Sequence, residues 1–514
     1  MKRLAILIIG LGFVIRLFSF RYTYIINPDG ALYIHQARAI YYGLNDSLTS
    51  CSLSFLSNYA IFIAGAYAIL RDWVIAAKIV SLLFGSMTLI PIYFLVKRFF
   101  HDKIALLVTL ILCLMPVFVA RSADVVRDPV YWFFSILGLY LFVSQLDQKN
   151  NLYLILASLS FLMAAWARIE AVLFTLISSL YILFVQKEEK IKTLSLFILP
   201  LVLLALCFAA GLMFFNVSAD DLYRTRQIAA KLSAPVVEYE NLRRDLAELM
   251  GQTLNGNLSP FLHKTRNLVW LIALGTLLRY LVAAFFYPFF FVFIVGLGGV
   301  WRKIKADRRI LYLAITAISA LVLLYVHVVQ TWTIFNRFMA LFILPSLIFL
   351  GFGLEKVLVF FRARFNLKES VALSVVCLLI LASSLPKNLK PRETDKLVFK
   401  RIGELIAERE GNDREIMVAT SQHSIRWVSF YANAKFQGAP CPEKNCDLEG
   451  MVGNSYEEFV ENLRKRGIRY FLWEENHWPK LSAQYISSQN PGDFVRVGEW
   501  SHPDTGKLIL FRVI

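Results

Sequence analysis

Eleven apolar stretches approach or reach the roughly 17–25 residues that a helix needs to cross about 30 Å of hydrocarbon. They run over residues 4–20, 73–96, 104–120, 129–145, 152–168, 171–186, 193–215, 271–299, 310–328, 337–355 and 370–386. The 514-residue chain is 57% hydrophobic and 18% charged, whereas soluble domains are about 45–50% apolar and 25% charged. This composition excludes a soluble intracellular enzyme, a disordered chain and a small disulfide-stapled secreted domain. The pattern predicts an α-helical polytopic membrane protein of about eleven spans.

One further apolar segment, and the first of the eleven, each allow more than one interpretation. Residues 53–70 form either a twelfth span or a helix lying at the membrane interface. A twelfth span would move Lys97, Arg98 and Lys103 outside, so the interfacial helix is favoured. The N-terminus, Met1-Lys-Arg followed by an apolar run, also has the form of a signal peptide. The run ends at Phe18-Ser-Phe-Arg-Tyr without a small-residue cleavage site, which favours an uncleaved anchor.

The formal net charge of +17 indicates orientation in the membrane. Residues 387–514 carry 19 Lys and Arg against 18 Asp and Glu, so residues 1–386 hold a net charge of +16. With Met1 in the cytoplasm, the inside loops hold 18 basic and 6 acidic residues, which is the positive-inside pattern. The basic face that nucleic-acid binding requires is missing. We therefore expect a multi-pass protein of the cell or inner membrane, with a periplasmic or extracellular C-terminal segment and no nucleic-acid partner.

This topology divides the chain into two parts. Residues 1–386 form a transmembrane domain with outer loops at 21–72 and 216–270, and residues 387–514 form a small extracytoplasmic α/β domain. Strand-like segments of that domain start at Glu415, Tyr470 and Leu508. Residues 456–466 have the apolar spacing of a helix face, and Gly467 follows where a C-cap belongs.

Three of the six cysteines lie on the expected outer side, at Cys51, Cys441 and Cys446. The short spacing of Cys441 and Cys446 makes this pair the candidate disulfide, because outer compartments are oxidising. A structural zinc site here would need two more thiolates or histidines at matching spacing, and none is nearby.

Polar residues at the outer ends of the spans are the candidate site. Asp29 follows the first span in Asn27-Pro28-Asp29-Gly30 and opens a probable helix that carries Tyr33 and stops at Gly43. Its ordinary interpretation is a helix N-cap. A second cluster, Arg121-Ser-Ala-Asp124-Val-Val-Arg127-Asp128-Pro129, follows the third span and is either a solvated turn or a phosphate-binding group.

Two further charged groups complete the set. Arg168 and Glu170 lie where two spans meet, so that close to hydrocarbon they are either paired, functional or snorkelling to the interface. Arg337 lies at the outer start of the span that contains Pro345, where it would contact either a substrate phosphate or ordinary lipid headgroups. No Gly-rich phosphate loop occurs, so a lipid-linked phosphate donor suits these arginines better than a nucleotide-linked one.

These motifs resemble those of the GT-C membrane glycosyltransferases. Pro28-Asp29-Gly-Ala-Leu-Tyr33 resembles their first-loop aspartate motif, and Ser-Ala-Asp124-Val-Val-Arg127-Asp128 their second-loop motif. Ala167-Arg168-Ile-Glu170-Ala resembles the Arg-x-Glu-Gly segment, and Asn336-Arg337-Phe338 followed by Pro345 resembles the Arg-Tyr…Pro span. The nearest branch contains the protein O-mannosyltransferases and the aminoarabinose transferase of lipid A. Gly30 replaces a second acid common in relatives, and the Trp-Trp-Asp motif of oligosaccharyltransferases is missing.

The resemblance implies transfer of a hexosyl or pentosyl unit, usually with inversion, from a polyprenyl-phosphate-linked donor to an acceptor hydroxyl on a protein, lipid or glycan. Asp29 would be the general base, and Arg337, with Arg121 and Arg127 behind it, would contact the leaving phosphate. Asp124, Arg168, Glu170 and Tyr33 complete the expected substrate-binding set. No cofactor is implied with certainty, and a divalent metal ion stays open. The alternatives are a lipid or sugar transporter and a non-catalytic scaffold, but transporters tend to place polar groups near the bilayer midplane.

Overall fold

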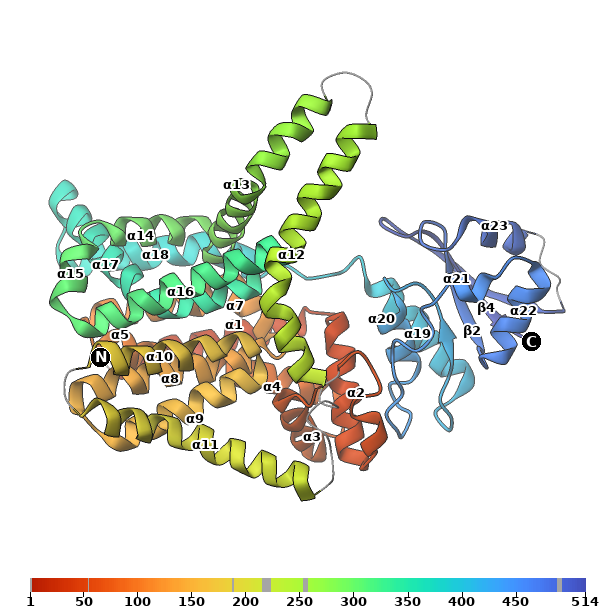
Figure 1. Cartoon of the computed structure of the whole chain (residues 1–514), viewed down its shortest axis with the longest axis horizontal. Helices are drawn as coiled ribbons and strands as arrows, with labels where there is room; N and C mark the ends of the chain where they lie inside the picture. Colours follow the sequence, from red (N-terminus) through yellow and green to blue (C-terminus); the bar gives the residue numbers. More distant parts are fainter. Residues whose placement is uncertain (1, 54, 187–188, 215–222, 253–257, 488–491) are drawn as a thin grey trace. The chain divides into compact units, whose positions relative to one another are not determined.

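The computed structural model describes residues 2–53, 55–186, 189–214, 223–252, 258–487 and 492–514 (Figure 1). It divides into two compact units. The first comprises residues 1–18, 82–122 and 127–389, and the second comprises residues 19–81, 123–126 and 390–514. The C-terminal segment therefore forms one unit with the first outer loop and with a short piece that follows the third predicted span.

The first unit is helical. Helices α1 and α4 begin or end in the other unit, and the remaining helices lie within this one. The elements are α1 (Lys2–Arg21), α4 (Trp73–Met87), α5 (Leu89–Lys97), α6 (Asp102–Leu114), α7 (Pro116–Ser122), α8 (Asp128–Gln148), α9 (Asn151–Ala167), η2 (Ile169–Ala171), α10 (Val172–Phe184), α11 (Lys190–Phe214), α12 (Tyr223–Gln252), α13 (Leu258–Phe285), α14 (Tyr287–Leu297), α15 (Val300–Ala306), α16 (Arg308–Thr331), η4 (Asn336–Met339), α17 (Ala340–Phe365) and α18 (Glu369–Asn388).

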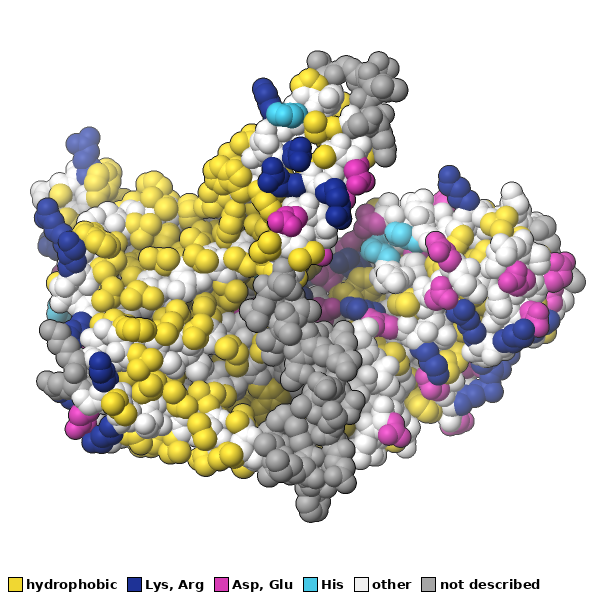
Figure 2. Space-filling model, viewed as in Figure 1, with side chains coloured by type: hydrophobic (Ala, Val, Ile, Leu, Met, Phe, Trp, Pro, Cys, Tyr) yellow, Lys and Arg dark blue, Asp and Glu magenta, His cyan; other side chains and the backbone are white. Residues whose placement is uncertain are grey.

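The prediction of a membrane-spanning helical protein is confirmed, whereas the predicted number of eleven spans is approximate. Among the described residues, eight helices are long and apolar enough to cross a membrane, or nine if α6 and α7, which meet at a bend of 58°, count as one span. Helices α9 and α10, also predicted as spans, are shorter apolar helices. Figure 2 shows hydrophobic side chains covering the visible face of this unit, and several are largely exposed, such as Ile6 at 69% and Phe184 at 81%. Such a surface suits lipid rather than water.

The stretch 271–299, predicted as one span, is instead divided between two helices. Helix α13 starts at Leu258, inside the predicted outer loop 216–270, and the chain breaks at Phe286, whose φ is 68°. Pro288 lies in the first turn of α14. Proline has no N–H, so it cannot donate the backbone hydrogen bond that would continue the preceding helix. Residues 215–222 and 253–257 of the same loop lie outside the described part of the chain.

The second unit combines helices with a small sheet. Its elements are α2 (Pro28–Tyr42), η1 (Asn45–Ser47), α3 (Asn58–Leu70), α19 (Leu397–Glu410), β1 (Val418–Ala419), α20 (Ile425–Ala432), α21 (Glu449–Val452), α22 (Tyr456–Lys465), β2 (Tyr470–Glu474), α23 (Lys480–Ser487), β3 (Phe494–His502) and β4 (Gly506–Val513). The strand order is β1-β2-β4-β3, with β1 parallel to β2 and the other neighbours antiparallel. Helix α3 has 13 residues, or about 20 Å at 1.5 Å per residue, too short to cross about 30 Å.

The predicted α/β character of the C-terminal segment is confirmed. The strand-like segments contain β1, β2 and β4, whereas the sequence analysis missed β3. The predicted helix is α22, which Ser455 caps through the amide of Glu458, and Gly467 takes a φ of 66° just after it. Phe459 and Leu463 of this helix join Phe471 and Phe511 of the sheet in one buried core.

The disulfide predicted between Cys441 and Cys446 was wrong. Cys441 pairs with Cys51 of the first outer loop, with their Cα atoms 5.8 Å apart, and Cys446 keeps a free thiol. A disulfide needs two Cα atoms about 4.4–6.8 Å apart with suitably directed Cβ atoms. Folding of the second unit gives this geometry to a cysteine 390 residues away in the chain.

Candidate active site

Helix α2 presents Asp29 in its first turn. The side chain of Asn27 accepts a hydrogen bond from the amide of Asp29 (3.1 Å), and Pro28 occupies the start of the helix, where an N–H is not needed. Asn27 is therefore the N-cap, and the interpretation of Asp29 as the cap was wrong. The helix ends, as expected, at Gly43, whose φ is 69°. Because Asn27 satisfies the helix end, the carboxylate of Asp29 is left available for another partner.

That partner is Arg426, at the start of α20. Its Nη1 donates to Oδ1 of Asp29 at 2.8 Å, and its Nε donates to Oε1 of Glu443. The Asp29 side chain is 35% exposed and that of Arg426 is 27% exposed, so both reach solvent. Arg426 and Glu443 also line a polar pocket of about 740 Å³, together with Cys51, Cys441 and Lys444. The second unit thus holds a fixed, solvent-accessible carboxylate beside a pocket large enough for a sugar residue.

Asp124 supports the start of α2 from the neighbouring segment. Its Oδ1 accepts the amide of Asn27 at 2.9 Å and that of Val125 at 2.8 Å, and the residue is only 5% exposed. A Cβ at Gly30 would approach Val125 to 2.7 Å, so the two segments come close only because residue 30 is glycine. Tyr33, the other predicted residue of α2, is buried in an edge-to-face contact with Tyr59. Asp124 and Tyr33 therefore position the helix that carries Asp29.

A second charged cluster lies in the first unit, around Asp128 at the start of α8. Arg168 donates to Oδ1 of Asp128 at 2.7 Å and to Glu170 at 3.2 Å. Arg337 of η4 lies 4.0 Å from Oδ2 of the same aspartate. The Asp128 side chain is 1% exposed and that of Arg168 is 5% exposed. Charged side chains that are buried to this extent are stable only when they are paired. Pairing, rather than snorkelling to the interface, therefore explains how the charge of Arg168 is accommodated.

The two arginines of this cluster also share an aromatic neighbour. The guanidinium carbon of Arg168 lies 4.2 Å from the ring centroid of Phe338, and that of Arg337 lies 5.8 Å from the same ring. Phe335 adds a further ring 5.3 Å from Arg337. The Arg337 side chain is 17% exposed, against 5% for Arg168. Arg337 is therefore the more accessible cation of the pair.

The two remaining predicted arginines lie at the ends of helices in the first unit. Arg121 is in the last turn of α7, and Arg127 directly precedes α8. Both are half-buried, and Arg127 interacts electrostatically with Glu170. Arg127 thus adds positive charge to the cluster around Asp128.

Three residues of these clusters were not among the predicted site residues. Asp128 belonged to the second-loop motif in the sequence but was given no role of its own, although its position between two arginine-bearing segments could have indicated a buried partner. Arg426 and Glu443 lie in the C-terminal domain, and no local pattern marks them. Only folding, which brings chain positions 397 residues apart into contact, reveals them.

The surroundings of Asp29 do not fit a divalent cation. A guanidinium already occupies one oxygen of its carboxylate and a second carboxylate, Glu443, is bound to the same guanidinium. A cation placed there would meet the positive charge of Arg426, which already pairs with both carboxylates, whereas such ions prefer several oxygen ligands of their own. The replacement of a second acid by Gly30 points the same way.

Comparisons with known proteins agree with this fold. Residues 58–214 match the model of the dolichyl-phosphate-mannose-protein mannosyltransferase family. No curated protein matches the chain by sequence. The fold resembles that of ArnT from Cupriavidus metallidurans bound to undecaprenyl phosphate, with a TM-score of 0.62 and 10% identity over 98% of this chain and 97% of that one. It also resembles the oligosaccharyltransferase of Archaeoglobus fulgidus in complex with Zn and sulfate, with a TM-score of 0.56 and 13% identity over 98% of this chain and 72% of that one.

These findings confirm the resemblance to the GT-C glycosyltransferases that the sequence motifs indicated. At identities this low the structural likeness concerns the fold, and the family match covers residues 58–214. Together they support a membrane glycosyltransferase of the GT-C type. Among GT-C proteins, the matching family is that of the dolichyl-phosphate-mannose-protein mannosyltransferases.

Proposed function

We propose that this protein transfers a sugar from a polyprenyl-phosphate-linked donor to an acceptor hydroxyl on a protein, lipid or glycan at the outer face of the membrane. The donor class is supported by the fold shared with ArnT, a protein solved with undecaprenyl phosphate, and by the absence of a nucleotide-binding motif from the sequence. The positive-inside charge pattern supports a cytoplasmic N-terminus and an outer C-terminal domain.

Asp29 is the proposed general base, and the observation that carries this role is its ion pair with Arg426. A base must be held within hydrogen-bond reach of the proton it removes. The cap at Asn27 fixes the backbone of Asp29, and the 2.8 Å contact with Arg426 fixes its side chain. With 35% of its side chain exposed, Asp29 can be reached by an acceptor.

Arg337 is the proposed contact to the leaving phosphate. Arg168 is committed to Asp128 and Glu170 at 2.7 and 3.2 Å, whereas Arg337 lies 4.0 Å from Asp128. The Arg337 side chain is also the more exposed of the two, at 17% against 5% for Arg168, so a phosphate oxygen can reach it more easily. Arg121 and Arg127 are the next choices, since both lie on segments that adjoin α8. Guanidinium groups suit this role because they donate two parallel hydrogen bonds to phosphate oxygens.

The reaction is a single displacement at the anomeric carbon. The acceptor hydroxyl gives its proton to Asp29 as its oxygen forms the new bond to that carbon. The bond from the carbon to the phosphate oxygen breaks, and the polyprenyl phosphate leaves with the electron pair, stabilised by arginine. One displacement with one base inverts the anomeric configuration. The same steps serve a hexosyl or a pentosyl donor.

The test is sugar release from a radiolabelled undecaprenyl-phosphate sugar by the purified protein in lipid nanodiscs. Asp29→Asn keeps the size of the side chain and removes its basicity, so we expect a loss of about 10²–10⁴-fold in turnover. Asp46→Asn is the matched control, because Asp46 is an exposed acid of the same outer loop. Full activity of Asp29→Asn, with normal formation of the Cys51–Cys441 disulfide, would exclude Asp29 as the base.

A further inference from the structure

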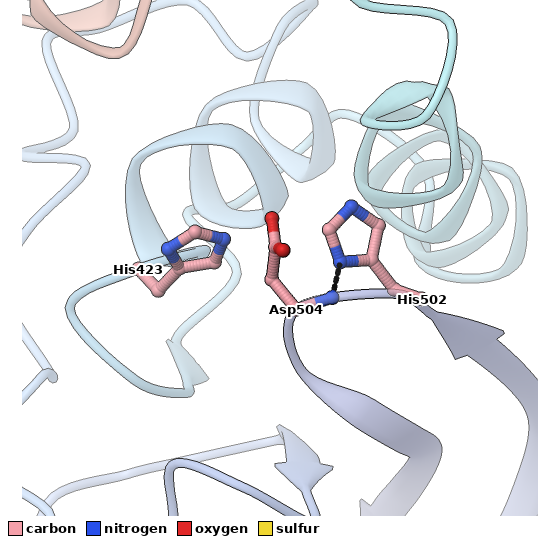
Figure 3. Close-up of side chains that lie close together, drawn as sticks. All are labelled: His423, His502 and Asp504. Carbon is pink, nitrogen blue, oxygen red and sulfur yellow. Dashed lines mark hydrogen bonds between the residues drawn. The ribbon is translucent and has the colours of Figure 1, made fainter.

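Two histidines and an aspartate converge in the C-terminal domain, within the second unit (Figure 3). One ligand-capable atom from each of His423, His502 and Asp504 lies within 4.8 Å of the other two. His423 precedes α20, His502 ends β3, and Asp504 is in the turn between β3 and β4. Figure 3 shows the Asp504 carboxylate between the two imidazole rings. Sequence analysis missed this group, because His423 lies far from His502 and Asp504 in the chain.

One ring nitrogen of each histidine in this group lacks a hydrogen bond among the described residues. Among the described residues, Nε2 of His423 and Nε2 of His502 are buried atoms without a hydrogen bond, and the side chain of His502 is 1% exposed. The nearest acid to His502 Nε2 is Asp395, at 3.9 Å, beyond hydrogen-bond distance. Phe399 lies against both rings, with centroids 6.0 and 5.0 Å away. A buried polar atom without a hydrogen-bond partner destabilises the folded state. A ligand that binds these nitrogens would remove that penalty.

A buried carboxylate holds the loop that carries His423. Glu474 is fully buried and accepts hydrogen bonds from Thr420 at 2.6 Å and Ser421 at 2.7 Å. The hydroxyl of Ser421 in turn accepts the amide of His423 at 3.2 Å. Glu474 also contacts Nδ1 of His477 at 3.0 Å, and the ring of His477 stacks on that of His423 at 5.1 Å. The imidazole of His423 is therefore oriented before any ligand arrives.

We infer that His423, His502 and Asp504 form a binding site for a divalent transition-metal ion of the Zn²⁺ class. Two imidazoles and one carboxylate are a recurrent donor set for Zn²⁺, which leaves a fourth position for water. Metal–ligand bonds of about 2.0–2.1 Å require ligand atoms roughly 3.4 Å apart, so the group must contract. Asp504 is exposed on a hairpin turn, and its side chain can make that movement.

The tautomer of His502 follows from which nitrogen ligates the metal. Nδ1 accepts the amide of Asp504 at 3.3 Å. Ligation through Nδ1 replaces this long bond, whereas ligation through Nε2 shifts the ring proton to Nδ1 and gives the bond up. Only ligation through Nε2 gives the buried nitrogen without a hydrogen bond a partner, because Nδ1 already accepts the amide of Asp504.

Such an ion would link the β3–β4 turn to the start of α20. Arg426, which holds Asp29, lies three positions after His423 on the same segment. The bound metal would therefore restrain the backbone that places Arg426. This role does not depend on the sugar-transfer proposal, since it concerns only the C-terminal domain and its ligand.

Zinc binding by the full chain tests the inference. The protein is stripped with a chelator, exchanged into chelator-free buffer and titrated with ZnCl₂ by calorimetry, and bound zinc is counted by mass spectrometry of the metal. We expect one ion per chain. Asp504→Asn should weaken binding by more than the roughly 10–100-fold that loss of an outer partner causes, and His423→Gln should do the same. Asp504 is exposed, so its substitution should leave folding intact.

His101→Gln is the matched control, because His101 is an exposed histidine of the first unit and its loss should leave zinc binding unchanged. Hydrogen exchange gives a second readout: Zn²⁺ should slow exchange over residues 420–430 and 500–506 in the native chain but not in Asp504→Asn. The inference is overturned if the chain binds no zinc with micromolar affinity, or if binding is the same in Asp504→Asn and His423→Gln as in the native chain.

Discussion

The guanidinium of Arg426 lies 2.8 Å from the carboxylate of Asp29, although 397 positions separate them in the chain. The contact joins the first turn of α2, directly after the first apolar helix, to the first turn of α20 in the C-terminal domain. It gives that domain a direct role in holding the proposed base. A segment that looks in the sequence like an appended domain is thus part of the unit that carries Asp29.

Loss of Arg426 should lower turnover through misplacement of Asp29. We expect Arg426→Gln to reduce kcat by about 10-fold or more, since small errors in placing a catalytic group are costly, and Arg426→Lys to restore part of it. Single-turnover sugar transfer measures the effect. Arg414→Gln is the control, because the Arg414 side chain is 59% exposed and its ion pair is with Glu410, not with Asp29. Equal activity of Arg426→Gln and Arg414→Gln would show that the pair has no catalytic importance.

Arg337→Ala should impair use of the donor more than use of the acceptor. Removal of a cation from the leaving phosphate weakens both ground-state binding and charge stabilisation in the transition state. We expect the donor KM to rise and kcat to fall, with the acceptor KM almost unchanged, in steady-state assays that vary each substrate separately. Arg362→Ala, at an exposed position near the end of α17, should behave like the native protein. An unchanged donor KM and kcat would make Arg337 a structural residue.

The pair between Asp128 and Arg168 should behave as a buried ion pair. Arg168→Leu leaves the 1%-exposed Asp128 carboxylate without its 2.7 Å partner, and such a loss costs about 3–5 kcal/mol. Asp128→Leu should cost a similar amount. The double substitution should cost less than the sum of the two, because neither the Asp128 carboxylate nor the Arg168 guanidinium is then left without the other. Thermal unfolding in detergent measures all three variants, and strictly additive losses would contradict the pairing.

The disulfide should cross-link distant parts of the chain. Non-reducing peptide mapping should recover Cys51 joined to Cys441. Cys51→Ser should lower the free energy of unfolding by about 2–5 kcal/mol. Cys446→Ser should leave both the cross-link and the stability unchanged, since Cys446 is a free thiol. Recovery of a Cys441–Cys446 peptide as the main product would contradict the structure.

His35 should make the second unit sensitive to mild acid. Burial lowers the pKa of His35, and contacts of its two ring nitrogens with the carbonyl oxygens of Pro440 and Ser47, each at 3.0 Å, oppose that shift only in part. The unfolded chain, with a histidine pKa of about 6.5, then binds the proton more readily than the folded one. Stability should be constant above about pH 6.5 and fall as the pH drops below it.

Thermal midpoints at pH 7.5 and 5.5 check this effect. His35→Gln should reduce the difference between the two midpoints, and His101→Gln should not. A native midpoint that rises on acidification would instead mean that both nitrogens donate to the two carbonyls from an imidazolium.

Membrane-spanning helices, the α/β character of the C-terminal segment and the GT-C resemblance could be predicted because each depends on local patterns. Length and hydrophobicity decide whether a helix can span, and the apolar spacing of Phe459 and Leu463 decides one face of α22. The same local patterns also gave three wrong predictions. It assigned Asp29 to a cap that Asn27 provides, paired Cys441 with its near neighbour, and carried one span through Phe286.

The sequence by itself determined the class of this protein, because hydrophobic periodicity, positive-inside charge and motif spacing act over tens of residues at most. Only the tertiary structure decided which charges meet. Arg426 with Asp29, Arg168 with Asp128, Cys51 with Cys441, and His423 with His502 and Asp504 all join segments that are far apart in the chain. Ion pairs, disulfides and metal sites need atoms within a few ångströms of one another, and chain separation carries no information about distances on that scale.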